Sequence, residues 1–331
     1  MTVIMAVFVG LRIKYNDTLT YINGYINITN SFSDFNEFNW SLGANPGFEL
    51  MNRIFRWFEI SSQTFVMIYA VFTICIYMWF IRKYTSNIFV SAFLFFTMGI
   101  YTFTMAAIKQ TFAVALCLVA VHCALQKKWF SFVVLILIAS TFHPYALMYL
   151  IVPFLMFKPW TQKTYLLLGT CIVLGIVLQS LFENIVSITT LLGEEYTTDS
   201  FSGEGVNVFR VLVVWIPVVL SFWTKNFLVK NENSADDLFL NLSMLNAGIM
   251  FVALFGTANY FARLANYFLI FQTISLPYIF KFFTEKNKKV LLICSLSGYL
   301  LYFYYANAIA QTFDAGFIKS SVFEYIKSLF F

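Results

Sequence analysis

Five cationic or titratable side chains lie where apolar segments of the chain end. They are Arg12, Lys109, His143, Arg210 and Arg263. A charge next to an apolar segment is costly to desolvate, so it needs a partner, a polar cavity or the water at a membrane surface. Several cations on one face suit an anionic ligand such as pyrophosphate, because arginine offers bidentate contacts and lysine a point charge. Fixed cations could also stabilise a pyrophosphate leaving group in place of a metal ion.

Two of these residues are unusual for a simple membrane interface. Lys109 and Gln110 interrupt the apolar stretch TMAAIKQTFAVAL, so we expect Lys109 to face a polar cavity and an anion. His143 precedes Pro144 between two apolar runs. It is either a buried, hydrogen-bonded structural residue or a general base, since imidazole titrates near neutrality. For every one of the five, the alternative to a functional role is a charged side chain that extends along apolar surface to place its charge at the membrane–water interface.

Polar and aromatic side chains surround two of the arginines. Arg12 is followed by Asn16 and Asp17. Asp17 is interpreted as an ion-pair partner of Arg12, an acceptor for sugar hydroxyls, or a base. Arg263 lies within NYFARLANYF, at 259–268, where rings alternate with amides. This pattern suits the faces and hydroxyls of carbohydrates, although an aromatic belt at a membrane interface produces the same pattern.

The composition determines the class of protein that must position these residues. The chain is 60% hydrophobic and 11% charged, with 331 residues, whereas soluble domains carry about 25% charged residues. No water-soluble fold could bury so much apolar surface, so the sequence predicts an all-α, polytopic membrane bundle. Ten apolar runs and a short first segment predict about ten to eleven membrane segments, several of them short or broken. The whole of 1–331 is interpreted as one membrane domain.

Several partners are disfavoured by the charged and metal-binding residues. The net charge of +5 includes no long basic cluster, so no nucleic-acid partner is expected. The five cysteines all lie in apolar runs without a CxxC pair, and there are two histidines. We therefore expect neither a metal site nor a cofactor. Residues 1–11 are too short to span and are interpreted as the second half of a helix.

The basic residues divide the connecting loops into two sets. Every second loop belongs to a set that holds 12 of the 21 basic residues and 4 of the 16 acidic ones. The positive-inside rule makes this set cytoplasmic, provided that 129–142 and 145–157 count as two passes around a tight turn. The sequence therefore predicts that the candidate residues lie near the outer face.

Two large loops and the C-terminal tail are predicted outside. The loop at 12–61 ends in an amphipathic segment, 46–58, that is expected to be a helix on the membrane surface or over a cavity. The acidic loop at 183–207 is expected to be a mobile lid. The tail, 307–331, ends in a candidate amphipathic helix, IKSSVFEYIKSLFF.

Four segments carry a resemblance to a known family. They are VGLRIKYNDTLTYINGY at 9–25, NPGFELMNRIFR at 45–56, AAIKQTFAVALCLVAVHCALQKKWFSFVVLILIASTFHPYALMYLIVPF at 106–154, and NYFARLANYFLIFQTISLPYIF at 259–280. In these segments the chain resembles the EpsG-like, Wzy-type polymerases of bacterial exopolysaccharide, capsule and O-antigen. The third segment is the most specific, with a basic residue and Gln at the start of a helix, a KK loop and an FH turn. Family members commonly have arginine where this chain has Lys109.

The resemblance implies a reaction, its partners and its site. The reaction is metal-independent glycosyl transfer between undecaprenyl-pyrophosphate-linked oligosaccharides at the outer leaflet of the bacterial plasma membrane, with lipid pyrophosphate as leaving group. The bilayer, a flippase and a chain-length regulator of the same pathway are the other implied partners. His143 or Asp17 is the implied base. The full candidate site consists of His143, Asp17 and Lys109 as catalytic residues and of Arg12, Asn16, Arg53, Gln110, Arg210 and Arg263 as substrate-binding residues.

Two other classes of membrane protein stay open from the sequence. A flippase or transporter for lipid-linked oligosaccharide would need a continuous polar path, whereas the middle parts of the apolar runs are nearly free of charge. A membrane acyltransferase that modifies sugars could also use a histidine. Its thioester donor would come from the cytoplasm, so its histidine and cations would be expected to open inward.

Overall fold

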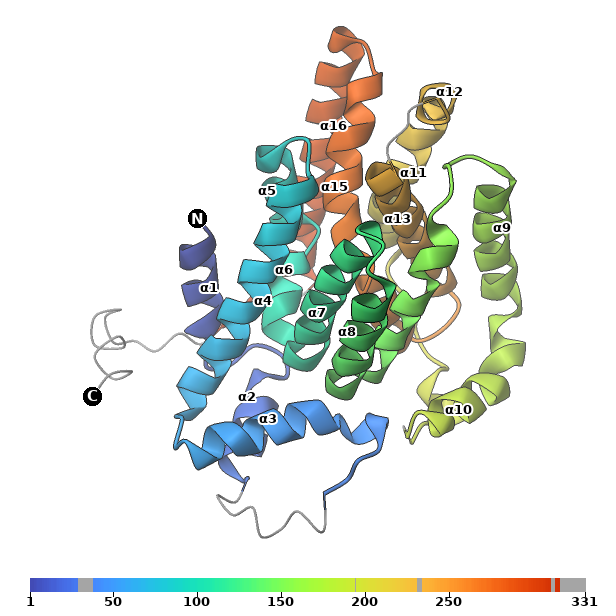
Figure 1. Ribbon diagram of the computed structural model, residues 1–331. Coiled ribbons are helices and arrows are strands. Elements are labelled where there is room, and N and C mark those ends of the chain that lie inside the picture. The colour runs from blue at the N-terminus through green and yellow to red at the C-terminus, as the bar shows by residue number, and fades with distance from the viewer. Residues whose placement is uncertain (29–37, 194, 231–233, 311–312, 316–331) are drawn as a thin grey trace.

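The computed structural model describes residues 1–331 except 29–37, 194, 231–233, 311–312 and 316–331, and the described part contains helices and no strands (Figure 1). The first half comprises α1 (Thr2–Gly10), α2 (Thr18–Ile26), η2 (Leu42–Ala44), α3 (Pro46–Trp57), α4 (Ser62–Tyr84), α5 (Ile88–Thr97), α6 (Ile100–Ala106), α7 (Ile108–Leu125), α8 (Trp129–Phe142) and η3 (Pro144–Leu155). The second half comprises α9 (Gln162–Val177), η4 (Leu178–Leu181), α10 (Phe182–Leu191), η5 (Thr198–Ser200), α11 (Val208–Trp223), α12 (Lys225–Leu228), α13 (Ser234–Val252), α14 (Ala258–Asn266), α15 (Ile270–Ile279), η6 (Phe280–Phe282), α16 (Glu285–Tyr304) and η7 (Tyr305–Ile309).

Helices of spanning length confirm a polytopic helical membrane protein. Among the described residues, five helical stretches are long and apolar enough to cross a membrane: α4, α7, α9 with α10, α13, and α16 with η7. The pair α5–α6, bent by 49°, makes a sixth if it counts as one span. The shorter apolar helices are α8, η3 and α11. The polytopic helical class is therefore confirmed, and several apolar helices are short or broken, as expected, but the described residues contain five or six helices of spanning length where the sequence predicted about ten to eleven membrane segments.

The bundle has two different ends. The connections that carry the basic residues, including α4–α5, α12 and α15–α16, lie at the upper end in Figure 1. The short helices α2, α3 and α10 lie at the opposite end. This arrangement follows the division of loops by charge, because the long helices run alternately up and down. The assignment of the basic end to the cytoplasm remains a prediction.

The predicted amphipathic helix at 46–58 is confirmed as α3. Asn45 adopts a left-handed conformation (φ 57°), and Pro46 occupies the first turn, where its fixed φ suits a helix start. The apolar face of α3 packs on the bundle through Phe48, whose ring lies 5.3 Å from that of Tyr69. The helix thus lies across the end of the bundle beneath α4 and α8 (Figure 1).

Pro144 divides the predicted hairpin into two different helices. α8 ends at Phe142, and the chain continues after His143 as the 3-10 helix η3. A helix of 14 residues reaches about 21 Å, so α8 is shorter than the hydrocarbon layer of about 30 Å. The buried amide of Asn241 on α13 donates to the carbonyls of Leu155 and Phe157, at 2.9 and 2.7 Å. These hydrogen bonds satisfy backbone carbonyl groups that have no partner within η3 at its C-terminal end.

Buried amides also tie α13 to the helices around it. Asn246 donates to the carbonyl of Ala265 on α14 at 2.6 Å. Gln272 on α15 donates to Asn246 Oδ1 at 2.7 Å and to the carbonyl of Val214 on α11 at 2.8 Å. In an apolar interior an unmade hydrogen bond is costly, so this chain of amides fixes the relative positions of four helices.

The loop predicted to be a lid is folded against the α13–α14 connection. Thr257 donates its backbone N–H to the carbonyl of Phe201, and Val206 to that of Ala253, both at 2.9 Å. Gly205 lies so close to the end of α13 that an added Cβ would be 2.2 Å from the Leu254 carbonyl oxygen. The second half of the loop is therefore attached by its backbone. The amphipathic helix expected in the tail lies outside the described residues.

We expect Gly205→Ala to lower the free energy of unfolding by about 1–3 kcal/mol, because the new methyl group meets backbone that must move. Gly169→Ala is the matched control, since an added Cβ there meets nothing within 4 Å. Thermal unfolding of both variants in detergent measures the difference. Equal melting temperatures for the two variants would contradict the close packing of this loop.

Candidate functional site

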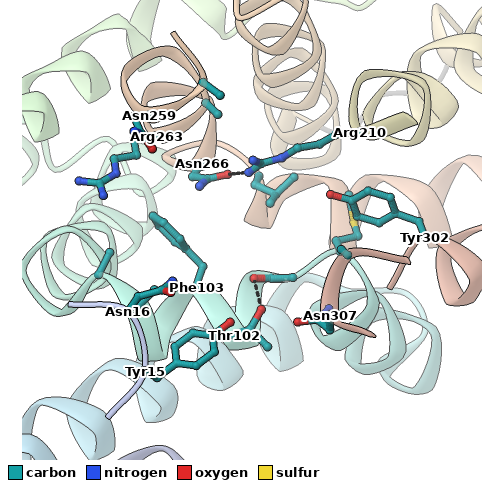
Figure 2. A pocket seen from close by; sticks show the side chains of 18 of the residues that line it. Tyr15, Asn16, Thr102, Phe103, Arg210, Asn259, Arg263, Asn266, Tyr302 and Asn307 are labelled. Atoms are coloured by element: carbon teal, nitrogen blue, oxygen red, sulfur yellow. Dashed lines mark hydrogen bonds between the residues drawn. The ribbon is translucent and has the colours of Figure 1, made fainter. Parts of the chain in front are cut away.

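A polar cavity of about 590 Å³ lies between the α1–α2 connection and α14 (Figure 2). We call it the main cavity. Its walls come from the α1–α2 connection, the bent pair α5–α6, α11, α14 and the end of α16. The polar side chains that line it are Tyr15, Asn16, Asp17, Thr97, Thr102, Arg210, Asn259, Arg263, Asn266, Tyr302 and Asn307.

The bend between α5 and α6 makes room for this cavity. Gly99 adopts φ +76°, a conformation that costs glycine little, and it lines the cavity between the two helices. Thr102, in the first turn of α6, donates to the Gly99 carbonyl at 3.1 Å. Figure 2 shows Thr102 and Tyr15 on the same wall. A hydrogen bond from Thr102 opposes the rise that burial imposes on the pKa of the Tyr15 phenol.

Two arginines enter the main cavity from opposite sides. Arg210 on α11 points toward Asn266 and donates to its Oδ1 at 2.9 Å (Figure 2). Arg263 on α14 lies 3.7 Å from Asp17 Oδ2, with the two side chains 53% and 46% exposed. An ion pair that is this exposed is weak, so an anion of higher charge can compete for the guanidinium.

A second, smaller cavity of about 280 Å³ lies along an adjoining face of α14. We call it the aromatic cavity because four tyrosines line it, together with Gln110, His143, Ser200, Asn259, Arg263 and Leu264. The tyrosines are Tyr145, Tyr196, Tyr260 and Tyr267. Asn259 and Arg263 line both cavities, so one turn of α14 borders two polar spaces.

Gln110 presents a hydrogen-bond acceptor in the aromatic cavity. Its amide nitrogen donates to the Arg263 carbonyl at 2.7 Å, which fixes the orientation of the amide group. Its Oε1 is buried and has no hydrogen-bond partner among the described residues. Because an unpaired buried carbonyl is costly, this oxygen suits a ligand that brings a hydroxyl group.

His143 is held as a neutral imidazole beside the same cavity. Its Nδ1 lies 2.7 Å from the Tyr267 hydroxyl, and the two groups share a hydrogen bond. Burial, together with the positive charges of Lys109 and Arg263, lowers the pKa of His143 to about 3. An imidazole with so low a pKa is a weak base at neutral pH, so its position favours hydrogen bonding over proton abstraction.

Lys109 lies next to these residues without lining either cavity. Its Nζ is 5.1 Å from the centre of the Phe48 ring and 6.0 Å from that of Tyr21. These distances are typical of cation–π contacts, which stabilise a charge in a poorly hydrated place. The positive charge that Lys109 adds near His143 thus comes from a residue supported by α2 and α3.

Arg12 is buried and lines neither cavity. Its side chain is 1% exposed and donates to the Val9 carbonyl and to Thr18 Oγ1, the latter at 3.1 Å. Of the three interpretations of Asp17, the ion pair with Arg12 is not the one the structure shows, since Asp17 pairs with Arg263. Arg12 therefore holds the α1–α2 connection behind the main cavity.

Arg53 is likewise separate from both cavities. Its Nη2 lies 2.7 Å from Glu49 Oε1, one turn earlier on α3. Its guanidinium also lies 5.4 Å from the centre of the Phe38 ring. Of the predicted residues, Asn16, Asp17, Arg210 and Arg263 line the main cavity, whereas Gln110, His143 and again Arg263 line the aromatic cavity.

Several lining residues carried no distinctive signal in the sequence. Tyr302 comes from the last apolar segment, Asn307 from the start of the tail, and Tyr196 and Ser200 from the loop after α10. Ordinary tyrosines and small polar residues at helix ends do not identify a site without the fold. Within the described part of the chain, no group of three or more His, Cys, Asp or Glu side chains could hold a metal ion.

The family model of the EpsG family matches residues 1–326, nearly the whole chain. The chain belongs to the EpsG family. This confirms the resemblance predicted from its sequence. No curated protein and no solved structure gives a significant match.

The segments that carried the EpsG resemblance meet around the two cavities. Asn16 and Asp17 come from the first segment, Gln110 and His143 from the third, and Arg263 from the fourth. The second segment is α3, whose Phe48 supports Lys109. Segments of this EpsG-family protein that are far apart in the sequence thus lie together around the two cavities.

We predict that His143 stays neutral down to about pH 5, two units above its pKa of about 3. The chain has two histidines, so ¹⁵N-histidine NMR spectra of the wild type and of His143→Asn assign both imidazoles. The His143 resonance is expected to keep neutral-imidazole shifts throughout this range. A titration midpoint near the ordinary value of about 6.5 would contradict the burial of this ring.

Proposed function

We propose that this EpsG-family protein polymerises oligosaccharide repeat units that are linked to undecaprenyl pyrophosphate, at the outer leaflet of the plasma membrane. The observation that carries the proposal is the position of Arg263, which lines two polar cavities along adjoining faces of α14. A polymerase must bring together two lipid-linked sugars, one as donor and one as acceptor. Two adjoining cavities with a shared guanidinium suit such a pair of substrates.

The proposed step is a glycosyl transfer. The hydroxyl oxygen of the acceptor sugar forms a bond to the anomeric carbon of the donor, and the bond from that carbon to the pyrophosphate oxygen breaks. The electron pair of the broken bond leaves with the lipid pyrophosphate, while the hydroxyl proton passes to a base. Arg263 and Arg210 would stabilise the negative charge that develops on the leaving group, because both guanidinium groups border the main cavity.

Asp17 is the stronger of the two candidate bases. Its carboxylate lines the main cavity and is paired with Arg263, the residue expected to bind pyrophosphate. A bound pyrophosphate would attract Arg263 and leave Asp17 free to accept a proton. His143, which is neutral and bonded to Tyr267, would position that tyrosine and the sugar beside it.

The rings of the aromatic cavity suit the sugar part of a substrate. Tyr260 packs edge to face against Tyr145 and Tyr196, with ring centres 5.6 and 5.5 Å apart. Aromatic faces bind the apolar faces of sugar rings, and Gln110 Oε1 offers an acceptor for a sugar hydroxyl. The flippase and the chain-length regulator would act before and after this step.

We expect Asp17→Asn and Arg263→Ala each to reduce polymer formation by about a hundredfold or more, since a positioned base or charge stabiliser contributes that much. Purified protein, incubated with lipid-linked repeat units, provides the assay, and gel separation gives the chain lengths. Single units on the lipid should accumulate. Lys288→Gln is the control, because it removes an ion pair at the opposite end of the bundle. Normal polymer from Asp17→Asn or Arg263→Ala would contradict the proposal.

We also expect a chelator to leave the purified polymerase active, because arginine side chains would neutralise the leaving group. The assay compares polymer formed with and without a chelator of divalent ions. Activity that is lost with the chelator and restored by one divalent cation would show that a metal has this role.

A further inference from the structure

An apolar groove of about 600 Å³ adjoins the aromatic cavity. We propose that this groove binds the polyisoprenoid chain of the acceptor, the second lipid-linked substrate, whose pyrophosphate and sugar lie in the aromatic cavity while the leaving pyrophosphate of the donor lies in the main cavity. The inference rests on the proposed function, since it assigns the lipid part of that substrate to a place on this chain. The groove lies between η3, α9, α10, α13 and α14, on the side of the bundle away from α1.

The groove and the aromatic cavity share three lining residues. Tyr145, Tyr260 and Leu264 border both spaces. On one side of them lie Gln110 and Arg263, and on the other side the lining is almost wholly aliphatic, as with Met148 and Ile249. An amphiphile with a charged, hydroxyl-bearing head and a long apolar tail matches this change of polarity.

The groove runs in the direction that a membrane lipid requires. Along α9 and η4 its lining extends from Leu167 to Leu178, about 16 Å at the rise of an α-helix. One leaflet of hydrocarbon is about 15 Å thick. The Leu167 end lies toward the basic end of the bundle, whereas α10 lies at the opposite end (Figure 1), and residues of α14 line both the groove and the polar cavities. A tail in the groove would therefore extend inward from a head group in the aromatic cavity.

The two faces of α9 allow this groove to be tested separately from the lipid-facing surface. Leu167, Leu174 and Leu178 line the groove at helical spacing. Val173 and Leu166 lie off that face and are 58% and 70% exposed. Only 17% of the apolar window of α9 with α10 is buried, so this wall leaves much apolar surface available to lipid.

An ordinary phospholipid would not use both spaces. Its acyl chain could enter the groove, but its head group has no oligosaccharide to place between Tyr145, Tyr260 and Gln110. A polyisoprenoid pyrophosphate that carries a sugar would gain binding free energy both from burial of its tail in the groove and from contacts of its head group in the aromatic cavity. Its affinity should therefore exceed that of a phospholipid for the same groove.

The test uses the full chain in nanodiscs of phosphatidylglycerol and a polyisoprenyl pyrophosphate probe with a photoreactive group in its tail. Crosslinks should form on α9 and η3, and unlabelled polyisoprenyl pyrophosphate should compete while added phosphatidylglycerol should not. Leu174→Trp fills the groove and should weaken labelling about tenfold. Val173→Trp, one residue along α9, should leave labelling unchanged. Melting temperatures of both variants verify that each is folded.

Each contrary outcome identifies which idea is at fault. Equal labelling of Leu174→Trp and Val173→Trp, or displacement of the probe by phosphatidylglycerol, would overturn the groove assignment. If Leu174→Trp also polymerised lipid-linked units like the wild type, the proposed function would stand without this groove. If the wild type bound the probe in the groove but formed no polymer from lipid-linked units, the polymerase proposal would fail while tail binding stood.

Discussion

The last turn of α14 is held by two buried amides, and the candidate site depends on them. Gln110 donates to the carbonyl of Arg263, and Asn246 donates to the carbonyl of Ala265. Carbonyls near the end of a helix lack partners within it, and in an apolar interior an unpaired carbonyl is costly. These two bonds thus fix α14 between the cavities. The fixed position of α14 in turn determines where the Arg263 guanidinium lies. It also determines the ion pair of Arg263 with Asp17 and the separation of the two cavities.

Local features of the fold could be predicted from the sequence, because they arise from contacts between neighbours in the chain. The amphipathic spacing of α3 and the break at Pro144 are of this kind. The bond from Gln110 to Arg263 joins residues 153 positions apart, so no local pattern indicates it. The burial of Arg12 could not be predicted for the same reason. It depends on how α1, α2 and α4 pack, whereas the sequence context of Arg12 resembles that of any cation at a membrane surface.

Family membership and geometry support different parts of the functional argument. The match to the EpsG family covers nearly the whole chain and places the protein in a class. The cavities then separate residues that the resemblance grouped together: Asp17 and Arg263 face open polar space, whereas Arg12 and Arg53 have structural contacts. The hydrogen bond between His143 and Tyr267, together with the low pKa of the imidazole, favours a hydrogen-bonding role for His143 over proton transfer.

Arg263 supplies a single positive charge to two spaces. An anion that draws the guanidinium toward one cavity removes part of the electrostatic attraction from the other. If phosphate groups bind in both cavities, as proposed, their occupancies are negatively coupled through this one side chain. By thermodynamic reciprocity the penalty is then the same whichever cavity fills first. Under the proposal, the shared arginine gives negative cooperativity within a single chain.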